Sequence, residues 1–172
     1  HLSSRRQRQM CIRDRYTGAN ANFDVNSGTT LTINGIVSGS GSAMTKLGSG
    51  NLTLSGVNTY TASTTISAGK VSISADSGLG AAPGSATAGH LTLNGGTLES
   101  TADFTLNSNR GIALGASNGI IDVNSGVTLT YGGIMAGSGT LTKVDSGTLT
   151  LSGVNTYSGS TTINGGTVSI SA

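Results

Sequence analysis

Ionisable side chains that could carry out acid–base chemistry gather in one part of the chain, between His90 and Arg110. The same stretch contains Glu99 and Asp103. Two carboxylates beside a basic side chain could act as general acid and general base in a polysaccharide lyase or hydrolase. Charged side chains at the corners of a repetitive fold also keep it soluble without any chemistry. We favour this second interpretation and predict no catalytic residue.

The motif Asp-Val-Asn-Ser-Gly occurs twice, at residues 24–28 and 122–126. An aspartate followed by other oxygen-bearing residues and a glycine could open a calcium-binding loop. An EF-hand loop would require a glutamate at its twelfth position, but residues 34–35 and 132–133 stand there instead. We therefore interpret the motif as an Asx-turn at a corner. The sequence predicts neither a metal site nor a cofactor-binding site.

Threonine and tyrosine side chains could contact ice or sugar. Thr-x-Thr motifs begin at Thr30, Thr128, Thr140 and Thr148, and a row of threonines on a flat face could bind either ligand. Threonine also has a high β propensity and pairs well across neighbouring strands. We favour this structural role because the motif does not recur on every coil.

Tyr60 and Tyr157 each follow an Asn-Thr dipeptide and could stack on a sugar ring. We expect instead that each ring packs over a corner with its hydroxyl group outward. The preceding Asn58 and Asn155 are expected to form hydrogen bonds within or between stacked turns.

All these side chains belong to an internal repeat, in which residues 122–172 closely resemble residues 24–75. Within each copy, short runs alternate an apolar residue with Thr or Ser, which is the period of a half-buried strand. Turn-forming clusters such as Ser-Gly-Val-Asn-Thr-Tyr and Asn-Gly-Gly lie between them. Each copy is therefore predicted to contain three strands in succession, separated by two turns. The spacer, residues 76–121, follows the same pattern.

The composition favours a fold of thin, stacked strands. The chain has 28 Gly, one Pro, no Trp and only 3% aromatic residues, so it cannot fill a wide core. It is nevertheless 35% hydrophobic, which argues against disorder. Three strands in roughly 20–25 residues is typical of one solenoid coil. We predict an all-β, right-handed parallel β-helix of about seven rungs, with an antiparallel β-sandwich as the alternative.

This fold would separate the two equivalent aspartates, Asp24 and Asp122. They would lie about four rungs, or roughly 20 Å, apart along the axis. They could not form one catalytic dyad.

Residues 1–15 differ from the rest of the chain. They contain five of the nine Lys and Arg residues and the only cysteine, Cys11. No apolar segment follows that would make them a secretion signal, and the body offers no aromatic platform for a nucleic acid. The string also resembles translated sequencing-adapter sequence. We expect a non-native or disordered basic head at 1–15, no nucleic-acid partner, and a body at 16–172 without disulfides or thiolate metal sites.

Residues 137–167, GSGTLTKVDSGTLTLSGVNTYSGSTTINGGT, resemble the passenger-associated β-strand repeat of bacterial autotransporters. The first copy departs from the pattern at Ala43, Met44, Asn51, Ala62 and Lys70. The positions of the second copy that match it are Leu141, Thr142, Lys143, Gly147, Thr148, Leu149, Leu151, Ser152, Gly153, Asn155, Thr156, Tyr157, Gly159, Thr162, Gly166 and Thr167.

The resemblance implies a parallel β-helical passenger that crosses the outer membrane by type V secretion through a C-terminal barrel of the parent chain. This sequence contains no such barrel and no apolar span of about 18 residues, so we expect a fragment of a longer protein. We predict a non-enzymatic stalk of a secreted or surface-displayed virulence adhesin. Its partners would be that barrel and a host surface or glycan receptor, or further copies of itself. The alternatives are a carbohydrate-active β-helix enzyme and a glycan- or ice-binding solenoid.

Overall fold

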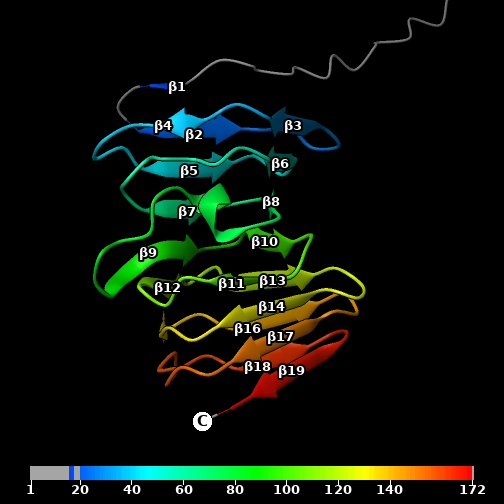
Figure 1. The fold of residues 1–172 in the computed structure, drawn as a ribbon. Helices are drawn as coiled ribbons and strands as arrows, with labels where there is room; N and C mark the ends of the chain where they lie inside the picture. Colours follow the sequence, from blue (N-terminus) through cyan, green and yellow to red (C-terminus); the bar gives the residue numbers. More distant parts are fainter. Residues whose placement is uncertain (1–15, 18–19, 172) are drawn as a thin grey trace, which may run out of the picture.

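The computed structural model describes residues 16–17 and 20–171. The predicted basic head, residues 1–15, lies outside the described residues. The chain winds downward through about seven stacked coils, from β1 at one end to β19 at the other (Figure 1). All strand pairs in the described residues are parallel. The prediction of a parallel β-helix is confirmed, and an antiparallel sandwich is excluded.

Three long sheets form the walls of the solenoid. The seven-stranded sheet contains β3 (Thr30–Ile33), β6 (Asn51–Leu54), β8 (Lys70–Ile73), β10 (Thr97–Ser100), β13 (Gly119–Val123), β16 (Leu141–Val144) and β18 (Thr161–Ile163). The six-stranded sheet contains β2 (Ala21–Asp24), β5 (Met44–Leu47), β7 (Thr64–Ile66), β9 (Thr87–Leu93), β12 (Arg110–Leu114) and β15 (Met135–Gly137). The four-stranded sheet contains β11 (Phe104–Leu106), β14 (Thr128–Tyr131), β17 (Thr148–Leu151) and β19 (Thr167–Ile170).

Two shorter elements complete the fold. The two-residue strand β1 (Tyr16–Thr17) pairs with β4 (Val37–Ser38) in the first coil. A 3-10 helix, η1 (Asp76–Leu79), follows β8 directly and occupies the third side of its coil, where later coils have strands of the four-stranded sheet.

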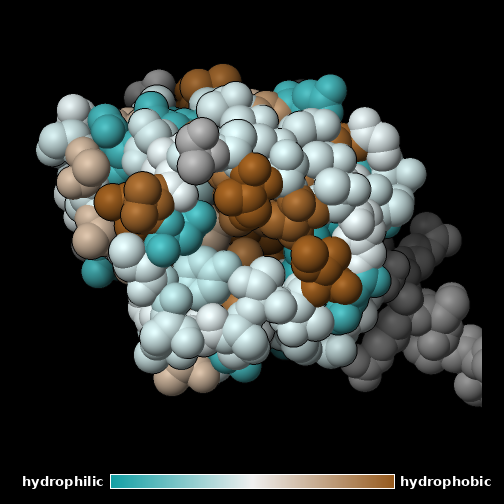
Figure 2. All heavy atoms as spheres, turned by 90° about the horizontal axis from the view of Figure 1, so that it is seen from below, coloured by the Kyte–Doolittle hydropathy of each residue, from teal (hydrophilic) through white to brown (hydrophobic). Residues whose placement is uncertain are grey.

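The core is a set of apolar columns along the solenoid axis. Alternate residues of each strand point inward, and in-register pairing places like side chains above one another, as with Leu52 and Val71 or Leu129 and Leu149. The end view in Figure 2 shows apolar side chains gathered in the middle of the C-terminal face. Tyr60 belongs to this core, being 1% exposed, and its hydroxyl group bonds to Thr64. The expectation that its hydroxyl points outward was wrong.

Corners between strands are fixed by glycine. Gly69 and its equivalent Gly166 have φ angles of 63° and 65°, a region that other residues seldom adopt. A Cβ atom on Gly69 would also lie 2.3 Å from the carbonyl oxygen of Gly50 in the coil above. The close stacking of coils therefore requires glycine at this corner.

The two repeat copies occupy different pairs of walls and share only the seven-stranded sheet. In the first copy, β5 and β7 belong to the six-stranded sheet and β6 and β8 to the seven-stranded sheet. Their equivalents in the second copy, β16 with β18 and β17 with β19, belong to the seven-stranded and four-stranded sheets. The second copy is thus displaced by one face around the axis. The repeat dictates a pair of strands and their corner, but not the wall on which they lie.

Candidate functional site

The ionisable residues that lie close together in the sequence do not form one site. Arg110 is 1% exposed and His90 is 5% exposed, so both side chains lie inside the solenoid. The carboxylate of Asp103 accepts a hydrogen bond from the backbone N–H of Thr128 (2.7 Å). Glu99 lies on the seven-stranded sheet and pairs with Lys70. Neighbours in sequence diverge because successive strands belong to different walls.

Arg110 holds the η1 segment against the solenoid. Its Nε donates to the Oδ1 of Asp76 (2.8 Å), and its Nη1 and Nη2 donate to the carbonyl oxygens of Leu79 (2.9 Å) and Gly80 (2.6 Å). The same Asp76 oxygen accepts the backbone N–H of Asn107 (3.0 Å). Both charged groups are therefore engaged in holding a loop. Sequence reasoning placed Arg110 near Asp103 and missed Asp76.

His90 is a buried histidine without a hydrogen-bond partner for either ring nitrogen in the described part of the chain. Burial lowers the pKa of His90, and the nearby charge of Arg110 lowers it further, against smaller opposing effects of the Thr61 backbone and Asp76. The ring is therefore neutral at physiological pH. A core histidine that is 5% exposed is not accessible to a substrate for proton transfer.

The seven-stranded sheet carries an ion-pair ladder that the sequence analysis did not anticipate. Lys70 Nζ lies 2.5 Å from Glu99 Oε1 and 3.5 Å from Asp122 Oδ2. Glu99 and Asp122 are register partners on β10 and β13, and Ser72 donates to the second oxygen of Glu99. The two carboxylates are separated in the sequence by about one coil length, but coil lengths vary too much for this spacing alone to predict the pair. Three coils are linked through these side chains.

The environment of this ladder shifts the pKa of Asp122 and of Lys70. Desolvation raises the pKa of Asp122, the charge of Glu99 adds to this effect, and Lys70 opposes it. Burial lowers the pKa of Lys70, but the hydrogen bond and charge of Glu99 outweigh it and raise the pKa overall. Lys70 bridges the two carboxylates. Among the described residues, no three His, Cys, Asp or Glu side chains are placed to hold a metal ion.

Each repeat copy contains a fully buried lysine at a corner. Lys46 is 0% exposed and donates to the carbonyl oxygens of Leu47 (2.6 Å), Gly48 (2.7 Å) and Ala68 (3.3 Å). The first two belong to its own coil and the third to the next coil. Desolvation lowers the pKa of Lys46, while the charge of Asp24 opposes this. The ammonium group therefore ties two successive coils together.

Lys143 repeats this arrangement in the second copy. It is also 0% exposed and donates to the carbonyl oxygens of Val144 (2.7 Å), Asp145 (2.8 Å) and Gly165 (3.4 Å). Burial lowers its pKa against the charges of Asp122 and Asp145. The lysine of the repeat signature is thus a structural residue on either wall of the solenoid.

The Asp-Val-Asn-Ser-Gly motifs form corners rather than loops around an ion. The backbone N–H of Thr29 donates to the carbonyl oxygen of Asn26 (3.1 Å), and Val127 donates to Asn124 in the same way (3.0 Å). The turns are therefore closed through backbone carbonyls of asparagine. The expectation that these motifs form corners is confirmed.

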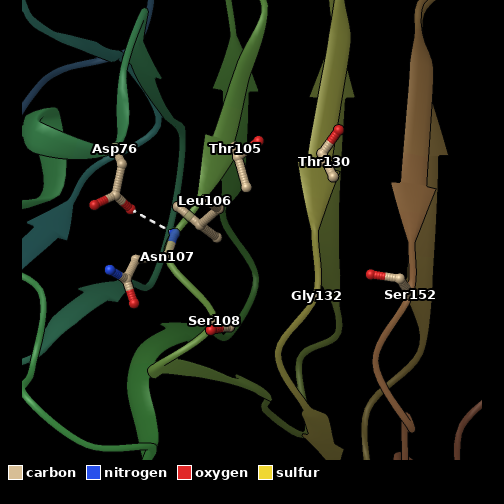
Figure 3. Close-up of a pocket in the computed structure, with 8 residues that line it drawn as sticks. All are labelled: Asp76, Thr105, Leu106, Asn107, Ser108, Thr130, Gly132 and Ser152. Carbon is tan, nitrogen blue, oxygen red and sulfur yellow. Dashed lines mark hydrogen bonds between the residues drawn. The ribbon is translucent and has the colours of Figure 1, made fainter.

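A groove of about 570 Å³ lies on the outer side of the four-stranded sheet, beside η1. Figure 3 shows Thr105 and Thr130 on neighbouring strands, with Ser152 further along and Asp76 and Asn107 at the other side. Its full lining is Asp76, Thr105, Leu106, Asn107, Ser108, Thr130, Gly132 and Ser152. The only ionisable group in this lining is Asp76, which is bound to Arg110. The groove can offer hydrogen bonds to a polar ligand but no free acid or base.

No helix among the residues that the structure describes is long and apolar enough to cross a membrane. The family model described as passenger-associated-transport-repeat matches residues 44–73 and 141–170. These ranges contain the strand pairs β5 to β8 and β16 to β19 with both corner lysines.

A curated relative, the adhesin BmaC autotransporter of Brucella suis biovar 1 (strain 1330), is 43% identical over 147 residues. The match covers 80% of this chain but only 4% of that relative. No solved structure matches the chain. The two family-model matches and this relative, together with the solenoid built from the repeats, identify the chain as part of an autotransporter passenger that carries passenger-associated-transport repeats.

Proposed function

We propose that this chain is a non-enzymatic stalk segment of a surface-displayed or secreted adhesin. The observation that carries the proposal is that the buried charged side chains act between coils. Lys46, Lys143 and Arg110 direct their donors to backbone carbonyls or to a carboxylate of the same fold. Such groups stabilise stacking and leave none of these charges for chemistry. The similarity to a named adhesin supports the same conclusion.

The proposed mechanism is mechanical. Each coil buries the apolar column of its neighbour and satisfies its backbone groups through parallel pairing. Adding coils therefore adds length without a new core. In this proposal residues 16–172 act as one unit, with repeat copies at 24–75 and 122–172 joined by the spacer at 76–121. The stalk would hold adhesive regions of the parent protein away from the cell, where the C-terminal barrel of that parent anchors it.

Two assays of the purified chain test this proposal. Beads coated with the chain should adhere to host cells no better than beads coated with albumin, since a stalk has no receptor site of its own. Incubation with a panel of bacterial and host polysaccharides should release no reducing ends. Glu99→Gln and Asp122→Asn variants provide the control, because these residues are the closest carboxylate pair on adjacent strands. Adherence would contradict a passive stalk, and polysaccharide cleavage that these variants abolish would establish the enzyme alternative.

A further inference from the structure

Lys70 is a side chain that the two repeat copies do not share. It begins strand β8, whereas Thr167 begins the equivalent strand β19 in the second copy. Because both strands form, the repeat itself needs no lysine at this position. Lys70 alternates with Val71, which is 0% exposed, so the lysine side chain lies on the outer face of the seven-stranded sheet. On that face it meets carboxylates from two later coils.

The triad of Lys70, Glu99 and Asp122 occupies three successive strands of this sheet. β8, β10 and β13 lie one below another (Figure 1). Lys70 Nζ lies 2.5 Å from Glu99 Oε1 and 3.5 Å from Asp122 Oδ2, and Glu99 is the register partner of Asp122. Groups held this close can react with effective molarities of about 10⁵–10⁸ M. The Lys70 amine is therefore within reach of the Asp122 carboxyl group.

Asp122 is a carboxyl group in a largely dehydrated site. Its side chain is 15% exposed and that of Glu99 is 13% exposed. The Oδ1 atom of Asp122 is buried without a hydrogen-bond partner in the described part of the chain. Burial raises the pKa of Asp122 against the charge of Lys70, and the charge of Glu99 raises it further. The neutral acid, which an amine can attack, is therefore more accessible here than at an exposed aspartate.

Glu99 is placed to accept a proton from Lys70. Burial lowers the pKa of Lys70, but the hydrogen bond and charge of Glu99 outweigh this effect, so the resting side chain is an ammonium. The same hydrogen bond directs one ammonium proton at Oε1 of Glu99. Ser72 donates to the other oxygen and holds the carboxylate in place. Glu99 is therefore the group that can convert the ammonium into a nucleophilic amine.

We propose that Lys70 and Asp122 form an intramolecular isopeptide bond, with Glu99 as the proton relay. Glu99 accepts a proton from the Lys70 ammonium and passes it to Oδ2 of Asp122. The neutral Nζ attacks Cγ of Asp122, and Glu99 relays a second proton from the nitrogen to the departing hydroxyl group. An Nζ–Cγ bond replaces the Cγ–Oδ2 bond, one water molecule leaves, and no oxidant, reductant or co-reactant takes part. The bond joins the two repeat copies across spacer strand β10. This inference goes beyond the proposed stalk function and does not depend on it.

Intact-mass spectrometry of the purified 172-residue chain tests for this bond. The folded natural chain should be lighter than its sequence by the mass of one water molecule. Digestion after denaturation should then yield a branched peptide joined at Lys70 and Asp122. Lys70→Arg should restore the full mass, because a guanidinium keeps the positive charge but stays protonated. Glu99→Gln keeps both reacting groups and should slow bond formation by about 100-fold or more, because it removes the acid–base relay.

Asp24→Ala is the matched control, since Asp24 is the equivalent of Asp122 in the first repeat copy. This variant should lose one water molecule as the natural chain does. Circular dichroism establishes that each variant is folded before its mass is compared. The proposal is overturned if the folded natural chain keeps its full mass after prolonged incubation at neutral pH. It is equally overturned if the loss of water persists in Lys70→Arg, or if the branched peptide joins other residues. Neither result bears on the adherence and cleavage assays of the stalk proposal.

Discussion

At the scale of single residues, the buried lysines are the most informative side chains of the repeat. An ammonium group can be buried at a corner because three backbone carbonyl oxygens surround it. The carbonyl oxygen of Leu47 also accepts the backbone N–H of Val25 (3.2 Å), so Lys46 supplies a second donor to it. One side chain therefore satisfies several acceptors from two coils.

Replacing Lys46 by methionine should be strongly destabilising. The methionine fills a similar volume but removes the ammonium donor that Gly48, Ala68 and Leu47 share, at a cost of about 2–3 kcal/mol in the free energy of unfolding. The measurement is equilibrium denaturation by urea. Val57→Ala is the control, because this side chain is 66% exposed and its truncation should change the free energy of unfolding by about 0–0.5 kcal/mol. Equal losses in the two variants would refute the role assigned to the buried lysine.

Asp145 occupies a position that the first copy gives to glycine. Its φ angle is 62°, and that of the equivalent Gly48 is 66°. The side chain of Asp145 offsets the unfavourable backbone by accepting the N–H of Ser146 (2.6 Å). Asp145→Ala should lower the free energy of unfolding by about 1 kcal/mol, whereas Asp145→Gly should retain or raise it. Thermal denaturation of the two variants decides this, and a glycine variant less stable than the alanine variant would be inconsistent with it.

His90 should make the solenoid less stable in mild acid. Its pKa is lowered in the folded state by burial and by Arg110, so the unfolded chain binds a proton that the folded chain does not. The free energy of unfolding therefore falls as the pH drops through about 6.5, with a slope of at most about 1.4 kcal/mol per pH unit. Urea denaturation between pH 7.5 and 5.5 measures this slope. His90→Leu should flatten it, and an unchanged slope in that variant would assign the effect to other groups.

At the scale of elements, η1 depends on a side chain from a distant coil. Arg110 on β12 reaches Asp76, Leu79 and Gly80, so the loop that replaces a strand is tied down from two coils below. Without these bonds, the carbonyl groups of the loop would face water or remain unpaired. The position of η1 between β8 and β9 therefore depends on Arg110.

Arg110→Met should open this loop while leaving the sheets folded. The substitution removes the buried guanidinium and its charge-assisted hydrogen bonds, and Asp76 loses its partner. We therefore expect the free energy of unfolding to fall by about 3–5 kcal/mol. Limited proteolysis should then cut within residues 80–86 many times faster than in the natural chain. Asp103→Ala serves as the comparison, because it removes only one hydrogen bond to Thr128. Cleavage elsewhere in the wall first would contradict this assignment.

Much of the strand content could be predicted because the elements of a repeat are local. The short runs that alternate an apolar residue with Thr or Ser are strands in the structure, as at Thr64–Ile66, Lys70–Ile73, Thr161–Ile163 and Thr167–Ile170, because the alternation and the glycine corners are local features of the sequence. This local reasoning could not predict the carbonyl oxygens that surround Lys46 and Lys143. It also could not predict the Arg110–Asp76 pair or the ion pairs of Lys70. Each depends on which residues of neighbouring coils share a corner or a wall, and coil lengths vary too much for spacing to fix that.

At the scale of the whole molecule, the displacement of the second copy by one face shows that the walls are interchangeable. A motif that folds on two different corners must carry its own corner chemistry, namely the lysine and the glycine with positive φ. The identity of the wall is set by the number of strands between β8 and β16, namely β9 to β15, and by η1 in place of one strand. No local pattern in the repeat could have revealed it.

Stacking between neighbouring coils leads to a prediction for the whole solenoid. Strands β7 and β8 lie between two coils, whereas β18 and β19, of nearly the same sequence, have a paired coil on one side only. In a fold stabilised by neighbouring coils, terminal coils open at a lower free energy than central ones. Amide exchange should therefore be at least about tenfold faster at Thr161–Ile163 than at Thr64–Ile66. Because the two segments have nearly the same sequence, their intrinsic amide exchange rates are nearly equal, and the measured difference reports protection by the fold alone. Equal rates at the two sites would mean that the described solenoid unfolds only as one unit, and that stacking does not distribute stability coil by coil.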